Sequence, residues 1–270
     1  MKKIVLITGA TTGIGKETAI YLSKKDYTVY GAGRRENKLK ELETSGIKTI
    51  KMDVTDDSQM AQGIEKIIDK EGRIDVLVNN AGFGSYGAVE DVSIADARYQ
   101  LEVNVFGAAR LIQLVLPYMR NQHYGKIVNI SSIGGKLATP FGGWYHASKF
   151  ALEGLSDSLR NEVRQFGVDV VLIEPGGVES EWAEIANDNL IKNSSGTVYR
   201  EMAEKFVKGL RQTTHKNAKA IVIAKLIEKA ITAHKPKARY SGGYMAKPAL
   251  FAKKILSDRL FDKVMMSQVK

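Results

Sequence analysis

The chain has 270 residues, of which 44% are hydrophobic and 26% are charged, an ordinary globular composition that excludes a disordered or fibrous protein. It contains no cysteine, so disulfide bonds and thiolate metal sites are excluded, and a cytoplasmic location is the simplest expectation. No apolar run approaches the roughly 18 residues that a membrane-spanning helix needs. We therefore expect a single domain covering residues 1–270, without a transmembrane segment.

The formal net charge of +10 is unevenly distributed. Residues 191–270 carry 18 Lys and Arg against 5 Asp and Glu, a balance of +13, whereas residues 1–190 carry 22 against 25, a balance of −3. A basic region can attract an anionic membrane, nucleic acid or an acidic ligand, although lysines at helical spacing most often form a solvated face. We expect no nucleic-acid binding, and peripheral membrane contact through the basic third stays open.

Short apolar and β-branched runs alternate with longer amphipathic segments from the N-terminus to about residue 175. The predicted strands are Lys3–Thr8, Thr28–Ala32, Ile47–Met52, Ile74–Asn79, Lys126–Ser131 and Val168–Glu174. Parallel strands need crossover connections and become buried on both faces, so the alternation predicts an α/β fold with a doubly wound parallel sheet of about seven strands. Ligands of such sheets bind beyond the carboxyl ends of the strands, near the point where the strand order reverses.

Two predicted helices are longer than the others, one from about Ser93 to Gln122 and one from Tyr145 to Phe166. The pattern changes after Pro175, where a stretch rich in Gly, Ser and Asn extends to Gly196 and predicts a mobile loop or lid. Further helical patterns follow. We expect residues 183–270 to form a substrate-binding loop and a helical C-terminal extension.

A glycine-rich turn, Thr8-Gly9-Ala10-Thr11-Thr12-Gly13-Ile14-Gly15, follows the first predicted strand, and a helical pattern begins near Gly13. Glycines permit positive φ and a close backbone approach to a pyrophosphate at the positive end of the helix. The alternative is a turn without a ligand, but its place between strand and helix favours a nucleotide site. The absence of a Gly-Lys-Ser/Thr sequence argues against a P-loop phosphotransferase. The candidate contacts are Gly9, Thr11, Thr12, Gly13, Ile14 and Gly15.

The second predicted strand indicates which nucleotide binds. It ends in Gly31-Ala32-Gly33-Arg34-Arg35, where a site that prefers a ribose 2′-hydroxyl would carry Asp or Glu. Two guanidinium groups can instead pair with a 2′-phosphate, so Arg34 and Arg35 favour NADP(H) over NAD(H). The alternative is that one or both arginines only face solvent.

Tyr145 and Lys149 lie four residues apart, a spacing that places a phenol and an ammonium on one helical face. Tyrosine has a pKa of about 10 in water, so it can exchange protons near neutral pH only where a fixed positive charge favours its phenolate. Lys149 can supply that charge. Such pairs also occur by chance as solvated neighbours, so the remaining motifs decide the interpretation.

Together these motifs resemble the short-chain dehydrogenase/reductase family, and the resemblance covers residues 3–182. Besides the glycine turn and Tyr145 with Lys149, it depends on Asp53-Val54, Asn79-Asn80-Ala81-Gly82, Asn104, Ser131-Ser132 and Pro175-Gly176, each except Asn104 after a predicted strand. The resemblance implies a Rossmann-type fold. It also implies cofactor contacts from Asp53 and Val54 at the adenine, Asn80, Ala81 and Gly82 at the adenosine, and Pro175, Gly176, Val178 and Ser180 near the nicotinamide.

The resemblance further implies a catalytic set of Ser132, Tyr145, Lys149 and Asn104. Ser132 is preferred to Ser131 because the family usually places its serine thirteen residues before the tyrosine. In the implied reaction a carbonyl bonds to Ser132 and Tyr145, NADPH delivers a hydride to carbon, and Tyr145 protonates the oxygen. Lys149 lowers the pKa of Tyr145 and holds the ribose, and Asn104 helps to hold a water relay.

We therefore expect an NADP(H)-dependent oxidoreductase of ketones, aldehydes and alcohols, without a metal. The apolar and basic tail resembles that of family members that act on steroids or retinoids, which suggests a bulky apolar substrate. The alternatives are a 3-oxoacyl-carrier reductase of the same family and a non-catalytic NADPH-binding regulator. Family members often assemble through their two long helices, so a homodimer or homotetramer is expected.

Overall fold

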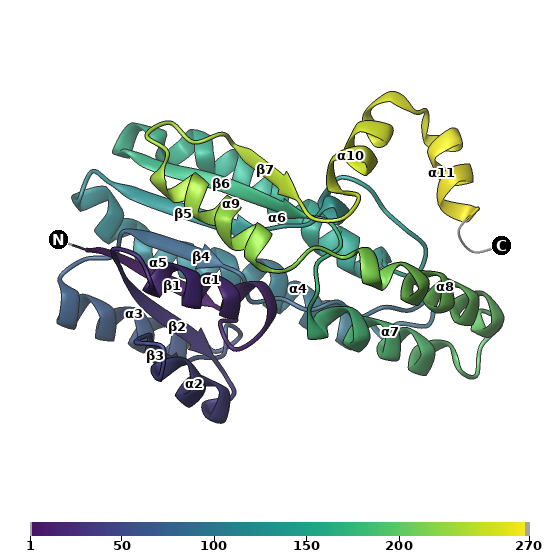
Figure 1. The fold of residues 1–270 in the computed structure, drawn as a ribbon, viewed down its shortest axis with the longest axis horizontal. Coiled ribbons are helices and arrows are strands. Elements are labelled where there is room, and N and C mark those ends of the chain that lie inside the picture. The colour runs from purple at the N-terminus through teal and green to yellow at the C-terminus, as the bar shows by residue number, and fades with distance from the viewer. Residues whose placement is uncertain (1, 268–270) are drawn as a thin grey trace.

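Seven parallel strands form the centre of the fold in the computed structural model, which describes residues 2–267 (Figure 1). Their order across the sheet is β3-β2-β1-β4-β5-β6-β7. The strands are β1 Lys3–Thr8, β2 Tyr27–Gly33, β3 Lys48–Lys51, β4 Val76–Asn79, β5 Gly125–Ile130, β6 Val168–Pro175 and β7 Arg239–Gly242. The predicted α/β class and parallel sheet are confirmed, and the order reverses between β1 and β4.

Helices cover both faces of the sheet, as predicted (Figure 1). The α-helices are α1 Gly13–Ser23, α2 Glu36–Glu43, α3 Asp57–Glu71, α4 Ile94–Leu101, α5 Gly107–Asn121, α6 Gly143–Val163, α7 Glu181–Ser194, α8 Arg200–Thr213, α9 Ile221–Thr232, α10 Ala246–Ile255 and α11 Asp258–Met266. Short helical turns are η1 Glu102–Phe106, η2 Ile133–Gly135, η3 Arg164–Phe166 and η4 Thr214–Lys216. Within residues 2–267, none of the helices combines the length and the hydropathy that a membrane span requires.

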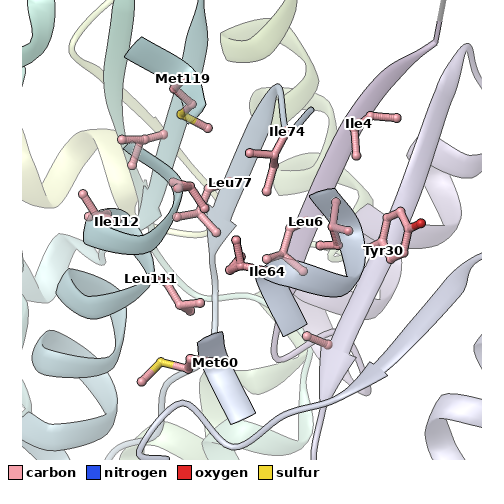
Figure 2. Packing of buried hydrophobic residues seen from close by; sticks show 14 of the residues in the cluster. Ile4, Leu6, Tyr30, Met60, Ile64, Ile74, Leu77, Leu111, Ile112 and Met119 are labelled. Carbon is pink, nitrogen blue, oxygen red and sulfur yellow. The ribbon is translucent and has the colours of Figure 1, made fainter. Parts of the chain in front are cut away.

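Alternating side chains along the strands fill two cores, one on each side of the sheet. Ile4 and Leu6 of β1 point to one side and meet α3 and α5 (Figure 2), whereas Val5 and Ile7 point to the other side and meet α1 and α9. Burial on both faces explains why the strands are nearly continuous apolar runs. This double core fixes the carboxyl ends of the strands, where the candidate site lies.

The structure corrects two of the predicted elements. The expected loop up to Gly196 contains the helix α7, because Trp182, Ala186 and Leu190 recur at helical spacing among the polar residues that suggested a loop. The predicted helix from Ser93 to Gln122 consists of α4 and α5 joined by the π-helical turn η1. Both differences concern the walls of the site.

The sequence predicts about seven strands but indicates the positions of only six, and β7 is the strand that it does not locate. Its four residues, Arg-Tyr-Ser-Gly, include no β-branched residue, so no apolar run indicates a strand. It pairs along β6, with Ile173 opposite Tyr240. Tertiary pairing rather than local preference therefore determines this edge of the sheet.

Candidate active site

The glycine turn adopts the conformation that its sequence predicts. Gly9 and Gly13 have φ values of +63° and +53°, and α1 begins at Gly13. A Cβ atom on Gly9 would lie 2.9 Å from Ala81 Cα, and one on Gly15 would overlap the Asn80 side chain. The turn is thus a tight backbone cradle at the positive end of α1, which fits the pyrophosphate of a dinucleotide.

Asn80 holds this cradle to the end of β4. Its Nδ2 donates to the carbonyl oxygens of Thr8 at 2.9 Å and Gly9 at 3.2 Å. In return, Thr8 Oγ1 accepts from the N–H groups of Asn80 at 3.1 Å and Ala81 at 3.0 Å. The ends of β1 and β4 are therefore tied together where the strand order reverses.

The two arginines after β2 lie on the rim of the cradle. Arg34 Nη1 lies 3.5 Å from Asp53 Oδ2, and Arg35 Nη2 donates to Thr11 Oγ1 at 3.4 Å. Arg35 also pairs with Glu181 at 3.4 Å. Both guanidinium groups are exposed and their ion pairs are long, so they retain donors for a phosphate beside the glycine turn.

The turn after β3 is built by its own side chains. Asp53 Oδ1 accepts from the backbone N–H and the hydroxyl of Thr55 at 3.0 Å and 2.9 Å. Val54 is buried, with its carbonyl oxygen packed against Gly107 of α5. Asp53 thus lies beside Arg34, and Val54 follows it in the same turn.

The segment after β6 closes the other side of the cradle. Gly176 donates its N–H to the Gly242 carbonyl at 2.8 Å, which joins the segment to β7. Ser180 precedes α7 and lies across from Gly13, where an added Cβ would be 3.2 Å from Ser180 Cβ. Ser180 therefore lies at the edge of the cradle, and Pro175, Gly176 and Val178 belong to the segment that leads to it from β6.

Ser132, Tyr145 and Lys149 come together at the ends of β5 and β6. Tyr145 and Lys149 are only 8% and 7% exposed. Lys149 Nζ donates to the Ile130 carbonyl at 2.8 Å and lies 6.0 Å from the centre of the Tyr145 ring. Ser132 Oγ accepts from the Gly134 N–H at 3.0 Å. Ser131, which is also buried, points away toward Gly135.

The pKa values differ from the expectation that Lys149 lowers the pKa of Tyr145. Burial raises the pKa of the Tyr145 phenol to about 12, and only the hydrogen-bonding Ser132 hydroxyl opposes this rise. Burial lowers the pKa of Lys149 to about 8, while the Glu153 carboxylate acts in the opposite direction. In this structure the phenol is therefore protonated at neutral pH, and the cost of desolvation outweighs the distant ammonium.

Asn104 lies in the π-helical turn η1 and faces the catalytic group. Its Nδ2 donates to the Phe83 carbonyl and to Ser148 Oγ, both at 2.9 Å, and its Oδ1 accepts from the Phe83 N–H at 3.1 Å. A Cβ on Gly82 would lie 3.0 Å from Asn104 Oδ1 and 3.7 Å from Lys149 Nζ. The π-turn thus brings the amide beside the lysine, in keeping with the frequent occurrence of π-bulges at functional sites.

His146, the residue after Tyr145, supports the loop that carries Ser132. Its Nε2 accepts from the Thr139 N–H at 3.0 Å, so Nδ1 must carry the proton that it shares with the Gly134 carbonyl at 2.9 Å. Burial lowers the pKa of this imidazole. Its position next to Tyr145 is visible in the sequence, but the loop that it holds is not.

Two aromatic residues that the sequence did not single out cover the phenol. The rings of Trp182 and Tyr86 lie 5.0 Å and 5.8 Å from that of Tyr145, centre to centre. They also contact each other edge-on at 5.9 Å. Only the position of Trp182 at the start of a helical pattern after Ser180 could have indicated a wall of the site.

Among residues 2–267, no group of three potential metal ligands occurs.

Comparison with known proteins places this geometry in a family. Residues 3–191 match the family model described as short chain dehydrogenase. The chain belongs to the short-chain dehydrogenase/reductase family. A probable short-chain type dehydrogenase/reductase of Helicobacter pylori is 37% identical over 262 residues, 97% of this chain and 96% of that protein. The resemblance stated from the motifs is therefore confirmed.

Two further relatives have more specific names. A 3-ketodihydrosphingosine reductase of Bacteroides thetaiotaomicron is 38% identical over 209 residues, 77% of this chain and 75% of that protein. An NADPH-dependent 3-dehydrocapnine reductase of Ornithobacterium rhinotracheale is 32% identical over 283 residues, with 99% and 98% of the two chains covered. Both names describe reductases, so this short-chain dehydrogenase/reductase is an oxidoreductase.

Solved structures agree with the fold. A short-chain dehydrogenase from Streptomyces avermitilis has a TM-score of 0.80 at 30% identity, covering 98% of this chain and 96% of that chain. ElxO with NADP bound has a TM-score of 0.74 at 29% identity, with 89% and 97% covered. A Burkholderia phymatum family member in complex with NAD has a TM-score of 0.76 at 26% identity, with 88% of each chain covered. Members of this family therefore use NADP or NAD, and the Rossmann-type fold is confirmed.

Proposed function

We propose that this protein interconverts a ketone or aldehyde and the corresponding alcohol, with NADP(H) as its cofactor. The observation that carries the proposal is the convergence of Ser132, Tyr145, Lys149 and Asn104 beside the glycine cradle, although they come from three separate parts of the chain: the loop after β5, the helix α6 and the turn η1. A protein that only binds the cofactor has no need for a buried phenol next to a buried ammonium.

Each side chain has a distinct task in carbonyl reduction. The bound nicotinamide cofactor supplies the hydride. Ser132 orients the carbonyl oxygen, and Tyr145, protonated at neutral pH because burial raises its pKa to about 12, donates the proton to that oxygen. Lys149 provides positive charge beside the oxygen that becomes negative. Asn104 fixes the backbone at Phe83 and would help to hold a water relay to Lys149.

The cofactor site favours NADP(H). The glycine cradle and α1 would hold the pyrophosphate, Asp53 and Val54 would flank the adenine, and Arg34 and Arg35 would pair with the 2′-phosphate. No carboxylate directly follows β2 to repel that phosphate. The NADP bound to ElxO and the name of the 3-dehydrocapnine reductase support this choice.

For the substrate, the proposal is a bulky apolar carbonyl compound. Trp182 and Tyr86 form an aromatic wall over Tyr145, and the helix α7 brings Trp182 to that wall. The two relatives named as 3-ketodihydrosphingosine and 3-dehydrocapnine reductases point to ketones of this kind. A 3-oxoacyl-carrier, a steroid and a retinoid belong in the same assay panel.

The decisive experiment measures NADPH oxidation with 3-ketodihydrosphingosine and the rest of that panel, first with the wild type and then with Tyr145→Phe. We expect the variant to lose at least about 100-fold in kcat because the proton donor is gone, while NADPH binding is retained. A near-wild-type rate would refute the assignment. NADPH binding without turnover of any carbonyl by the wild type would instead indicate a non-catalytic regulator.

The cofactor preference has its own test. We expect Arg34→Asp/Arg35→Asp to lose the preference for NADPH over NADH by at least about tenfold in kcat/KM, because each charge-assisted pair with the phosphate is lost. Arg98→Asp, an exposed arginine on α4, is the matched control. Equal use of both cofactors by the wild type would count against the role of these arginines.

We also propose that the protein is a homodimer or homotetramer assembled through α5 and α6. Phe106, just before α5, and Phe150 on α6 are exposed large apolar residues. Light scattering is expected to give two or four chains for the wild type and a smaller species for Phe106→Glu/Phe150→Glu. A monomeric wild type would exclude this assembly.

A further inference from the structure

The last two helices form an arm that leaves the body of the protein. Figure 1 shows α10 and α11, coloured yellow, standing away from the sheet and its covering helices. Phe261 is buried within the arm and lies under Lys253 Nζ at 5.2 Å, and Lys253 also pairs with Asp258 at 2.6 Å. The C-terminal arm, residues 246–266, is thus a packed helical pair whose outer surface faces solvent.

The outer face of α10 is apolar with basic edges. Phe251 and Ile255 are 64% and 61% exposed and lie four residues apart, so they form one apolar strip. Lys247 and Lys254 are exposed and fall beside them on the same helical face. A solvated surface helix does not need two large apolar side chains at its centre.

The outer face of α11 repeats this arrangement. Leu260 and Val264 are 47% and 41% exposed, four residues apart, and next to them lie the exposed Arg259 and Lys263. At 100° per residue, the acidic residues of α11 fall on a different side of the helix from Leu260. Both helices therefore present apolar residues with a lysine beside them, and on α11 Asp262 lies on the side of Arg259 away from Leu260.

We propose that the C-terminal arm docks the protein on an anionic lipid surface. Apolar side chains can enter the boundary between headgroups and acyl chains while lysines and arginines bind the lipid phosphates. A second copy of the chain fits less well, because a symmetric contact would bring these basic residues against their own counterparts. The +13 balance of residues 191–270 adds attraction to a negative surface.

The arm begins beside the candidate active site. Ala246, the first residue of α10, packs against Gly176, where a Cβ would lie 2.9 Å from the Ala246 nitrogen. Docking through the arm therefore brings the end of β6 close to the lipid surface. The proposal itself concerns attachment alone and does not depend on any substrate.

Vesicle co-sedimentation of the full chain tests the proposal, with vesicles of phosphatidylcholine alone and of phosphatidylcholine mixed with phosphatidylglycerol. We expect binding to the mixed vesicles that weakens as salt increases, and little binding to phosphatidylcholine. Arg259→Glu/Lys263→Glu should lower binding more than about tenfold, because each basic residue near an anionic surface changes it about fivefold. Phe251→Ser/Ile255→Ser should also release the protein.

Matched variants separate the arm from general effects. Lys66→Glu/Lys70→Glu changes the same charge on exposed residues of α3, and Val198→Ser removes an apolar side chain that is 91% exposed; both should bind vesicles like the wild type. Equal losses in the α3 and arm variants, or no binding of the wild type to mixed vesicles at low salt, would overturn the proposal.

Two further measurements keep the result unambiguous. Circular dichroism checks that each variant is folded. Light scattering shows whether Phe251→Ser/Ile255→Ser dissociates an oligomer. If this variant dissociates and the wild type does not bind vesicles, the apolar face contacts a second copy of the chain, and the proposal is overturned. Tyr145→Phe should bind vesicles normally, so a failure of the catalytic proposal is distinguishable from a failure of this one.

Discussion

Two buried charged residues on α6, Lys149 and Glu153, interact, and the second affects the pKa of the first. Glu153 lies one turn beyond Lys149, is itself buried, and pairs through Oε2 with Lys136 and Arg239, both at 2.9 Å. Its Oε1 accepts no hydrogen bond within residues 2–267. This carboxylate is the charge that opposes the effect of burial on the pKa of Lys149. Glu153 is therefore a positioning residue for the ammonium rather than a catalytic residue.

Replacing Glu153 by Gln is expected to move the pH profile of carbonyl reduction to lower pH. Burial lowers the pKa of Lys149 to about 8, and loss of the neighbouring carboxylate lowers it further, so the ammonium loses its proton earlier as pH rises. The measurement is kcat/KM between about pH 6 and pH 10. Asp157→Asn, which removes a carboxylate one turn farther along α6, should leave the profile in place; an upward or absent shift in Glu153→Gln would contradict the mechanism.

At the scale of elements, two irregular or unexpected helices shape the site. The π-turn η1 rotates Asn104 toward Lys149 and Ser148, and α7 carries Trp182 over Tyr145. The turn η1 interrupts the crossover helix between β4 and β5, and α7 lies in the long connection from β6 to β7. The regular strands and helices therefore position the candidate site, and the two irregular or unexpected helices, η1 and α7, supply side chains that line it.

Trp182→Ala is expected to open the site. The KM for a bulky apolar carbonyl should rise about tenfold, because the substrate loses an aromatic contact, while NADPH affinity changes little. The pKa of Tyr145, raised to about 12 by burial, should also fall as water reaches the phenol. Steady-state kinetics and ultraviolet titration check these effects, with Ile185→Ala, an exposed residue of the same helix, as the control. An unchanged KM would show that the substrate does not reach α7.

At the scale of the whole molecule, Arg239 joins the last strand, β7, to α6 and β6. Its guanidinium pairs with Glu153 at 2.9 Å, Asp157 at 2.6 Å and Glu174 at 3.3 Å. Burial raises the pKa of Glu174, so its neutral form is favoured in the folded protein. This group stabilises the fold below its ordinary pKa of 4.5, and that contribution is lost as pH rises through the higher folded value.

Arg239→Met is expected to destabilise the protein by about 3 kcal/mol near neutral pH, because the buried carboxylates lose their counter-charge. The loss should be smaller at about pH 5 than at about pH 8, since Glu174 takes up a proton more readily in the folded protein. Urea unfolding at the two pH values measures the difference. Lys205→Met, which removes an exposed cation from α8, is the control. A pH-independent loss would assign the effect to packing instead.

Most of the fold follows from local patterns, and the gaps have physical causes. The runs of β1 and β6 are apolar because both faces of the sheet are covered, so they are recognisable without the structure. The four residues of β7 form a strand only because β6 offers an open edge. In α7, polar Asn and Ser residues obscure the helical pattern in the sequence. This helix is stabilised by its contacts with α8 and with the site.

The sequence by itself determined the features that depend on neighbouring residues: the positive φ of Gly9 and Gly13, the four-residue spacing of Tyr145 and Lys149, and the absence of a carboxylate directly after β2. The tertiary structure decided what depends on burial and on distant contacts. Trp182 meets Tyr145 across 37 positions of the chain, and burial keeps the phenol protonated and weakens the hold of Lys149 on its proton. Desolvation is a property of the assembled site, so no spacing along the chain reveals it.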